Sequence, residues 1–342
     1  METTDLELCG IDLNNEVYFI AEIGNNHEGN FDLAVEMIHM AANSGVHAVK
    51  FQTFKTDNFI SCKNTERYEQ LASYEFSNEQ WKFLKSEANR LKVVFCSTPF
   101  DLVSATFLND LVPFFKISSG DNSFFPLLRT VAGFAKPIIL SCGMAKLGDI
   151  KIAKDYIESI WKDKGIKSKI ALLHCVSSYP TSDMDANLLS IPYLKRSLGG
   201  IIGYSDHTLG IDAACTAVSL GAQIIEKHFT IDKNLSDFHD HKISATPDEF
   251  KDLVERSKRI RNLLGTETKS IASSERRTIS AARRSIVAVR DLAKGHFLEL
   301  KDLTWVRPTG GLPPGKENSL LGRSLLRSIK KHDIITEMDI KP

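Results

Sequence analysis

The sequence predicts an α/β protein built as a (β/α)8 TIM barrel followed by a small C-terminal domain. Short β-branched and aromatic runs alternate with longer segments of helical periodicity, which is typical of βα units on a parallel sheet. Eight such runs fall within the first 265 of 342 residues, the usual size of this barrel. An open doubly wound sheet is the alternative. The glycines after the first run, Gly24 and Gly29, do not form the G-x-G-x-x-G of a dinucleotide site, which favours the barrel.

The predicted strands are short, apolar runs that become polar at their ends. In chain order they are residues 17–22, 47–52, 93–97, 114–118, 137–141, 170–175, 201–205 and 223–228. Between them lie amphipathic segments such as 31–45 and 78–92, whose apolar residues recur every three and four positions. Each of these segments is expected to form a helix that returns the chain to the next strand.

The composition changes after Gly265. Residues 266–284 are polar and rich in serine and arginine, which predicts a linker between a barrel of residues 1–265 and a second domain of residues 285–342. The second domain holds short strands and turns. Because a domain of this size buries little core by itself, we expect it to dock against the barrel or another subunit.

Overall charge and hydropathy exclude several function classes. Lys plus Arg and Asp plus Glu are both 43, so the net charge is zero, which argues against a nucleic-acid partner. No apolar run approaches the length of a membrane span. The acidic N-terminal segment lacks the basic start and apolar core of a secretory signal. Six cysteines without a CxxC pair are expected to be reduced structural thiols, and we therefore expect a cytoplasmic protein with no membrane partner.

Polar side chains gather where the eight predicted strands end. In a TIM barrel the active site is built from these C-terminal strand ends, so the sequence predicts a shared polar cavity. The residues concerned are Glu22, Lys50, Gln52, Ser97, Lys116, Ser119, Asp121, Ser141, His174, Ser177, Tyr179, Ser205, Asp206, His207, Glu226, Lys227 and His228.

Lys50 and Lys116 interrupt otherwise apolar strands, where an unpaired ammonium is costly. One interpretation pairs them internally with Glu22 or Glu226. The other uses both lysines, with hydroxyl groups of neighbouring strand ends, to hold the phosphate and carboxylate of a small anionic substrate.

His207 and His228 end neighbouring strands, so both imidazoles are expected to reach one divalent ion with open coordination positions. Glu22 is interpreted either as a general base or water-positioning group, or as a counter-ion of Lys50. Asp240, within the sequence DFHDHKIS, is expected to contact substrate rather than a second metal. Arg307 precedes a proline and could be presented by a rigid turn.

Taken together, the strand-end motifs resemble the phosphoenolpyruvate-dependent sialic acid synthase family. The resemblance spans nearly the whole chain and rests on nine motifs in order: AEIGNNHEG (21–29), VKFQTFK (49–55), FCSTPFD (95–101), FKISSGD (115–121), ILSCGM (139–144), LLHCVSSYPT (172–181), GYSDHT (203–208), EKHFTIDK (226–233) and RPTGGLPP (307–314).

The resemblance implies a TIM barrel with a C-terminal SAF, or antifreeze-like, domain, in a domain-swapped homodimer. It also implies condensation of phosphoenolpyruvate with the open-chain aldehyde of an N-acetylhexosamine such as N-acetylmannosamine, giving N-acetylneuraminate and phosphate.

The resemblance assigns roles to individual residues. His207 and His228 match the ligands of Mn²⁺ or Mg²⁺, and Glu22 matches an acidic residue near the attacking water. The matches to the phosphoenolpyruvate-binding set are Lys50, Lys116, Ser119, Ser141 and Ser205, and Ser177 stands where an asparagine is common in the phosphate-binding loop. The matches to sugar-contacting positions are Gln52, Tyr179, Asp240 and Arg307, with Asp121 where many members have glutamate.

Three alternatives remain open at this point. Legionaminic and pseudaminic acid synthases use the same chemistry on 6-deoxy diacetamido sugars, for which the pocket should be less polar. A deoxy-sugar phosphate aldolase would need further basic residues at the cavity mouth. A carbohydrate- or ice-binding module on an inactive barrel would be expected to lack His207 or His228, and both are present.

Overall fold

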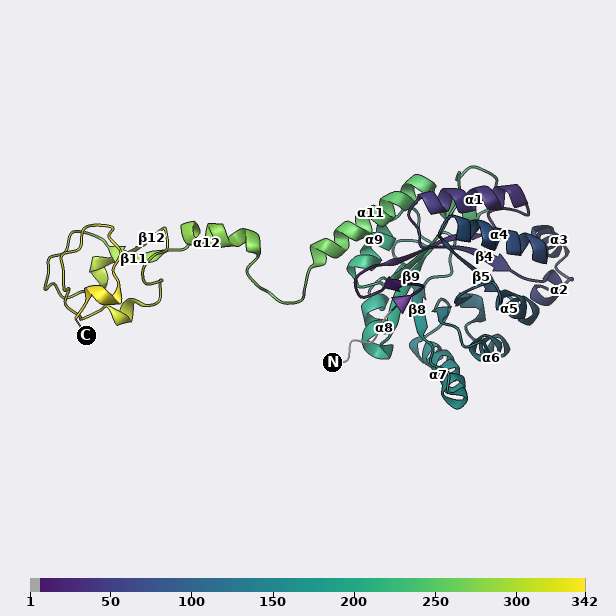
Figure 1. Cartoon of the computed structure of the whole chain (residues 1–342), viewed down its shortest axis with the longest axis horizontal. Helices are drawn as coiled ribbons and strands as arrows, with labels where there is room; N and C mark the ends of the chain where they lie inside the picture. Colours follow the sequence, from purple (N-terminus) through teal and green to yellow (C-terminus); the bar gives the residue numbers. More distant parts are fainter. Residues whose placement is uncertain (1–6, 342) are drawn as a thin grey trace. The chain divides into compact units, whose positions relative to one another are not determined.

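The computed structural model describes residues 7–341. It divides into two compact units, residues 1–265 and residues 266–342, which are described separately (Figure 1).

The first unit contains an eight-stranded parallel sheet, in the order β5-β4-β3-β10-β9-β8-β7-β6. The two end strands, β5 and β6, lie beside one another and nearly close the barrel. The strands are β3 (Tyr18–Gly24), β4 (Ala48–Thr53), β5 (Val94–Pro99), β6 (Phe115–Ile117), β7 (Ile138–Ser141), β8 (Ile170–Cys175), β9 (Ile201–Asp206) and β10 (Ile224–His228). Every predicted strand coincides with one of them, and the predicted barrel is confirmed.

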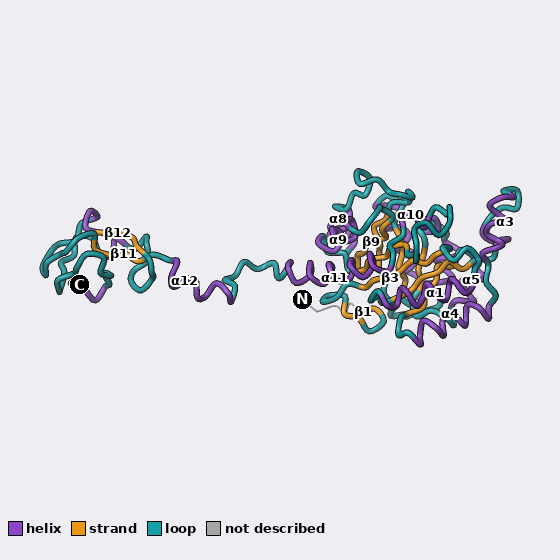
Figure 2. The backbone as a smooth tube through the Cα atoms, turned by 90° about the horizontal axis from the view of Figure 1, so that it is seen from above, coloured by secondary structure: helices purple, strands orange, loops and turns teal. Residues whose placement is uncertain are grey.

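Helices surround this sheet, as Figure 2 shows for the purple elements around the orange strands. Local sequence signals define several helix starts: Asn30 accepts from the Leu33 N–H to begin α1, and Ser77 and Gln80 form a capping box on α4. The helices are α1 (Phe31–Asn43), α2 (Thr56–Phe59), α3 (Thr65–Tyr74), α4 (Asn78–Arg90), α5 (Leu102–Leu108), α6 (Phe125–Gly133), α7 (Leu147–Lys164), α8 (Ser190–Leu198), α9 (Asp212–Ser219), α10 (Asp240–Ile243) and α11 (Pro247–Leu264).

Strand alternation decides which side chains enter the barrel. Ile20, Ala48 and Phe114 belong to the small apolar cluster inside the barrel. Because side chains two residues apart on a strand share a face, the residues two positions later also point inward. These are Glu22, Lys50 and Lys116, so the inner apolar floor and the polar top of the barrel come from the same strand faces.

A short hairpin that the sequence did not predict lies at the other end of this inner cluster. It pairs β1 (Glu7–Leu8) with β2 (Ile11–Asp12). Leu8 and Leu13 pack into the inner cluster, so the hairpin covers the barrel floor on the side away from the polar strand ends.

The second unit has its own core around β11 (Ser285–Ala288) and β12 (Leu303–Val306), which pair antiparallel. Inside the predicted linker the chain forms a 3-10 turn (Ser273–Glu275) and α12 (Arg276–Ala282), so that segment is partly helical. Other 3-10 turns are Leu300–Asp302, Glu317–Ser319 and Glu337–Asp339. Buried Asp302 accepts from Arg290 and contacts His296 at 2.7 Å.

None of the helices in residues 7–341 is both long and apolar enough to cross a membrane.

We predict that His27 makes barrel stability depend on pH. His27 is fully buried, and its ring stacks on that of Phe76 with the two ring centroids 4.4 Å apart. Its Nδ1 atom accepts a hydrogen bond from the Gly29 N–H at 3.0 Å. Burial lowers its pKa from 6.5 to about 3, so the folded chain keeps it neutral while the unfolded chain protonates it. Its contribution to stability is therefore full above pH 6.5 and declines as the pH falls from 6.5 towards 3, by at most about 1.4 kcal/mol per pH unit.

The matching variant is His27→Asn, whose side-chain carbonyl can still accept from Gly29. The free energy of unfolding, measured with urea, should fall between pH 7.5 and pH 5.5 in both proteins. The fall should be about 1 kcal/mol smaller in the variant than in the wild type. Equal pH dependence in both proteins would refute this role for His27.

Candidate active site

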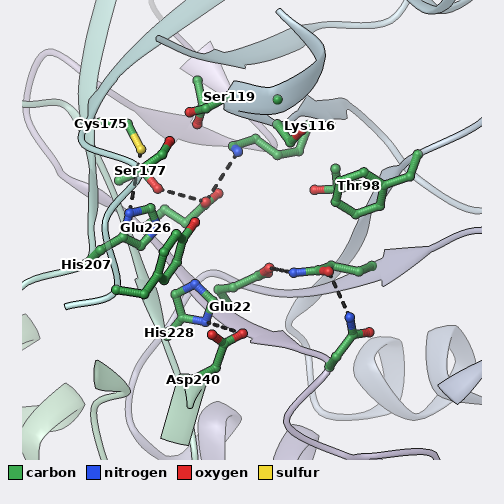
Figure 3. A pocket seen from close by; sticks show the side chains of 18 of the residues that line it. Glu22, Thr98, Lys116, Ser119, Cys175, Ser177, His207, Glu226, His228 and Asp240 are labelled. Carbon is green, nitrogen blue, oxygen red and sulfur yellow. Dashed lines mark hydrogen bonds and ion pairs between the residues drawn. The ribbon is translucent and has the colours of Figure 1, made fainter. Parts of the chain in front are cut away.

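A pocket of about 470 Å³ lies at the C-terminal ends of the barrel strands (Figure 3). All eight strands contribute to its wall, through Glu22, Lys50, Thr98, Lys116, Ser141, Cys175, Ser205, Glu226 and His228. This is where a TIM barrel builds an active site.

Of the residues to which the sequence assigned a catalytic, metal-binding or substrate-binding role, the pocket brings together all except Arg307. The lining includes Glu22, Lys50, Gln52, Lys116, Ser119, Asp121, Ser141, Ser177, Tyr179, Ser205, His207, His228 and Asp240. Arg307 follows β12 in the second unit, so its role stays a prediction.

Four polar strand-end residues do not line this pocket, contrary to the prediction from the sequence: Ser97, His174, Asp206 and Lys227. Asp206 and Lys227 directly follow the pocket residues Ser205 and Glu226, and strand alternation turns them to the opposite face. There they form a fully buried ion pair at 2.8 Å, and Lys227 also donates to the Thr208 carbonyl. The alternation itself is the sequence signal that would have separated them from the site.

The structure also adds pocket residues that the sequence did not assign. Cys175 was expected to be a structural thiol, yet it lines the pocket. Arg67 comes from α3, in the connection between β4 and β5, where no strand-end rule applies. The further additions are Asn25, Phe59, Thr98, Phe100, Ser118, Gly120, Met144, Phe238 and His239.

A buried cluster of two lysines and two glutamates forms the base of the pocket. Lys50 Nζ lies 2.8 Å from Glu22 Oε2 and 3.6 Å from Glu226 Oε1, and Lys116 Nζ lies 3.3 Å from Glu226 Oε1. Burial by itself would raise the pKa of Glu226, but Lys116 and Lys50 lower it to about 2. The internal pairing expected as one alternative, with Glu22 or Glu226 as the partner of the lysines, is therefore present, and Glu226 is its centre.

Several polar atoms in and beside this cluster have no hydrogen-bond partner, or only distant ones, among the described residues. Ser141 Oγ and Glu226 Oε2 are buried without a hydrogen-bond partner. Among residues 7–341, the polar contacts of Lys116 Nζ are long, at 3.3 Å to Glu226 and 3.4 Å to the Ile117 carbonyl. Because buried polar groups are almost always hydrogen-bonded, these free groups mark a place for a bound polar molecule. Lys116 and the Ser141 hydroxyl are suited to an anionic one.

Glu22 sits between the lysine cluster and an amide chain. Its Oε1 accepts from Gln52 Nε2 at 3.1 Å, and Gln52 Oε1 accepts from Asn25 Nδ2 at 2.9 Å. Burial raises the pKa of Glu22, and nearby Lys50 offsets only part of this effect. A carboxyl group with a raised pKa that is held in a fixed orientation can exchange a proton with a bound water or substrate.

His207 and His228 face one another across the pocket, with ring centroids 5.4 Å apart. His207 Nδ1 lies 2.8 Å from the Val176 carbonyl, to which it can only donate, so in the neutral ring the Nε2 lone pair is free. His228 Nδ1 is buried without a hydrogen-bond partner, and burial lowers its pKa to about 3, which keeps the ring neutral. Burial lowers the pKa of His207 as well, but the Cys175 side chain and the Val176 carbonyl outweigh it and raise that pKa above its usual value. A divalent metal ion would bind the neutral form of both rings, so metal binding at this pair would compete with protonation of His207.

In residues 7–341, no three or more His, Cys, Asp or Glu side chains are arranged to hold a metal ion. An ion at the two histidines would therefore complete its coordination with oxygen atoms of water or substrate. This is the open arrangement of catalytic rather than structural metal sites.

The mouth of the pocket combines aromatic rings with a few polar groups. The Tyr179 ring lies 4.3 Å from that of His207, and the Phe59 and Phe100 rings are 4.5 Å apart. Phe238, Arg67 and His239 belong to the same lining. Such a wall suits a molecule with both apolar and polar faces, as sugars have.

Comparison with known families agrees with this geometry. The model of the NeuB family matches residues 37–269, and the SAF domain model matches residues 283–341. The chain belongs to the NeuB family.

The relatives of this NeuB-family chain include synthases with different products. The N,N'-diacetyllegionaminic acid synthase of Campylobacter jejuni is 38% identical over 93% of this chain and 98% of the relative. The N-acetylneuraminate-9-phosphate synthase of Homo sapiens is 32% identical over 97% and 96% of the two chains. The crystal structure of N-acetylneuraminic acid (sialic acid) synthetase from Leptospira borgpetersenii, in complex with citrate, is 37% identical. It has a TM-score of 0.75 and covers 80% of this chain and 94% of that one.

We predict that Gly143, which follows β7, is needed to shape the anion site of this NeuB-family protein. A Cβ at Gly143 would lie 2.6 Å from both Ser119 Oγ and Ser177 Oγ, and the Gly143 N–H donates to Ser119 Oγ at 3.1 Å. Gly143→Ala should displace both hydroxyl groups and raise the KM for an anionic substrate about tenfold, the cost of roughly one lost hydrogen bond. Gly148→Ala, where an added Cβ meets nothing within 4 Å, is the matched control. An unchanged KM in Gly143→Ala would contradict the prediction.

Proposed function

We propose that the protein condenses phosphoenolpyruvate with the open-chain aldehyde of N-acetylmannosamine and water, giving N-acetylneuraminate and phosphate. The observation that carries the proposal is the combination, in one pocket, of a lysine and hydroxyl site for an anion with two facing histidines suited to a metal. Membership of the NeuB family supports a synthase activity.

The reaction balances without a further co-reactant. C3 of phosphoenolpyruvate forms a bond to the aldehyde carbon, and the aldehyde oxygen takes up a proton. Water adds to C2. The bond between C2 and the oxygen that bridges to phosphorus then breaks, so that phosphate leaves with this oxygen and C2 becomes a ketone. The added water gives up both of its protons as its oxygen becomes the ketone oxygen: one replaces the proton that the aldehyde oxygen takes up, and the other leaves with the phosphate as hydrogen phosphate.

The described residues divide between the two substrates. Lys50, Lys116 and Ser141 are assigned to the phosphate and carboxylate of phosphoenolpyruvate, with hydroxyl groups of Ser119, Ser177 and Ser205. Glu22 is assigned to the water that adds to C2, because Gln52 fixes its orientation and burial raises its pKa.

A divalent ion, Mn²⁺ or Mg²⁺, would be held by His207 and His228 and would polarise the aldehyde oxygen as a Lewis acid. Around that position, Tyr179 packs on His207 and Asp240 lies beside His228. These two side chains, with Gln52 and Asp121, are assigned to the sugar.

A second acceptor class is favoured by one feature of the pocket mouth. Phe59, Phe100 and Phe238 form an apolar wall there, and such a wall suits the methyl group of a 6-deoxy diacetamido hexose better than a hydroxyl group. Legionaminic or pseudaminic acid synthesis is therefore the alternative. Arg67, at the same mouth, is the basic group that a phosphorylated sugar would require.

Phosphate release from phosphoenolpyruvate separates these acceptors. After EDTA treatment and addition of Mn²⁺, release with N-acetylmannosamine supports the sialic acid reaction. Release only with 2,4-diacetamido-2,4,6-trideoxymannose moves the protein to the legionaminic branch, and release only with N-acetylmannosamine 6-phosphate assigns a role to Arg67. No release with any of these sugars or with the pseudaminic acceptor would overturn the proposed reaction.

The proposal also covers the oligomeric state of the protein, through Arg307 and the second unit. We place Arg307 at the sugar of a neighbouring subunit in a domain-swapped homodimer. The small core of the second unit supports an expectation that it packs against another surface.

A further inference from the structure

Glu28 adopts a backbone conformation that is unfavourable for glutamate. Its φ is +45°, in the left-handed region, which costs an ordinary side chain about 1 kcal/mol and which asparagine or glycine enters more easily. The residue lies in the turn after β3, where its N–H donates to the Asn25 carbonyl at 2.9 Å. A glutamate at this point needs a reason beyond the turn itself.

The Glu28 side chain joins the turn to a segment more than 200 residues later in the chain. Its Oε1 accepts from Ser236 Oγ at 2.5 Å and lies 3.0 Å from His241 Nε2. His241 is fully buried, and its Nδ1 forms a hydrogen bond with Thr230 Oγ1 at 2.8 Å. One carboxylate oxygen therefore fixes both ends of residues 236–241, the segment that leads into α10.

This segment carries Asp240. Asp240 and His241 are adjacent on the short helix α10, and they serve different surroundings: His241 binds Glu28, whereas Asp240 lines the pocket. Asp240 Oδ2 lies 3.8 Å from His228 Nδ1, and Figure 3 shows the two side chains pointing towards one another. The position of His241 thus determines where the Asp240 carboxylate sits.

The same turn supplies a second anchor. Asn26 is fully buried and donates through Nδ2 to Ser244 Oγ at 2.9 Å, and Ser244 Oγ donates to the Asp240 carbonyl at 2.7 Å. Asn26 therefore holds the backbone of Asp240 through Ser244. Glu28 holds the neighbouring residue, His241. Both anchors belong to the turn that follows Glu22 on β3.

We infer that Glu28 is a positioning residue, which holds residues 235–244 so that Asp240 meets the sugar acceptor. The inference rests on the proposed function, because it assigns the acceptor to Asp240. Loss of the Glu28 carboxylate leaves the buried His241 Nε2 without its acceptor, a cost that is relieved when the segment moves. The anion site at Lys50 and Lys116 makes no contact with Glu28 among the interactions of the described residues, so phosphoenolpyruvate binding should be spared.

The decisive variant is Glu28→Asn. Asparagine favours the left-handed backbone but is too short to reach His241, so it relieves the strain and removes the contact. We expect the melting temperature to be unchanged or higher, while the KM for the sugar rises about tenfold and the KM for phosphoenolpyruvate changes less than about twofold. Glu28→Gln keeps the length and an accepting oxygen, and it should retain a sugar KM within about threefold of the wild type.

A matched control tests the backbone effect alone. Lys92→Asn changes another left-handed residue, with φ of +61°, that is exposed and does not line the pocket. It should leave both KM values unchanged. A sugar KM in Glu28→Asn that stays at the wild-type value would overturn the inference. So would a large fall in melting temperature with equal losses for both substrates, because that result indicates a purely structural role.

Hydrogen–deuterium exchange tests the contact without any substrate. In Glu28→Asn, amides in residues 235–244 should exchange faster than in the wild type and in Lys92→Asn. Unchanged exchange there would overturn the positioning role even if the enzyme is active. If exchange increases but no sugar is condensed with phosphoenolpyruvate, the proposed reaction fails while the contact itself stands.

Discussion

His228→Ala is expected to lower kcat/KM at least about 10³-fold, because stabilisation of the aldehyde oxygen by a metal contributes several kcal/mol and each 1.4 kcal/mol is tenfold in rate. The Nδ1 atom of His228 is buried without a hydrogen-bond partner, and the ring is neutral. Its removal loses no hydrogen bond of that atom, so the folding cost should come from the cavity left beside Tyr179 and His207. His207→Ala should have a comparable effect on activity.

Two measurements separate this effect from misfolding. The Mn²⁺ content after gel filtration should fall in both histidine variants, and the far-ultraviolet circular dichroism should match the wild type. His39→Ala is the control, because His39 is partly exposed on α1 and its partners in the described part of the chain, Glu87 and Arg90, lie on α4. Full activity in His207→Ala and His228→Ala would remove the metal site from the proposal.

Lys116→Met is the second substitution with a large expected effect. Lys116 is 3% exposed, and its long contacts leave donor capacity for an anionic ligand. Removal of a buried cation that binds phosphate or carboxylate should lower kcat/KM for phosphoenolpyruvate by about 10²- to 10³-fold. Methionine preserves most of the side-chain volume, so the loss should come from charge.

The variant also changes the pocket electrostatics in a definite direction. Lys116 is the main group that lowers the pKa of Glu226 against the effect of burial, so that pKa should rise in Lys116→Met. Lys55→Met is the control, since Lys55 forms a half-exposed surface ion pair with Glu75. If Lys116→Met binds phosphoenolpyruvate as tightly as Lys55→Met does, the anion site is misassigned.

The barrel and most of its pocket were predictable because strand alternation and strand-end polarity are local properties. Glu22, Lys50 and Lys116 each interrupt an apolar strand, and in a closed barrel such positions converge. The same rule, applied without attention to side-chain direction, wrongly placed Asp206 and Lys227 in the cavity. Their pairing on the opposite face follows from a one-residue offset.

Other features depend on contacts that sequence spacing does not encode. The β1–β2 hairpin consists of two-residue strands, too short for a periodic signal. Arg67 reaches the pocket from α3, which lies in the connection between β4 and β5. Glu28 contacts His241, which is 213 residues later in the chain. These depend on how connections pack, which only the folded chain shows.

The measurement that tests the proposed reaction most directly uses phosphoenolpyruvate labelled with ¹⁸O in the oxygen that bridges C2 and phosphorus. With Mn²⁺ and an accepted sugar, the proposed pathway predicts that the label appears in inorganic phosphate and that no phosphate is released without sugar. Label retained in the keto acid, or phosphate released without sugar, would contradict the C–O cleavage and coupled condensation assigned to this pocket.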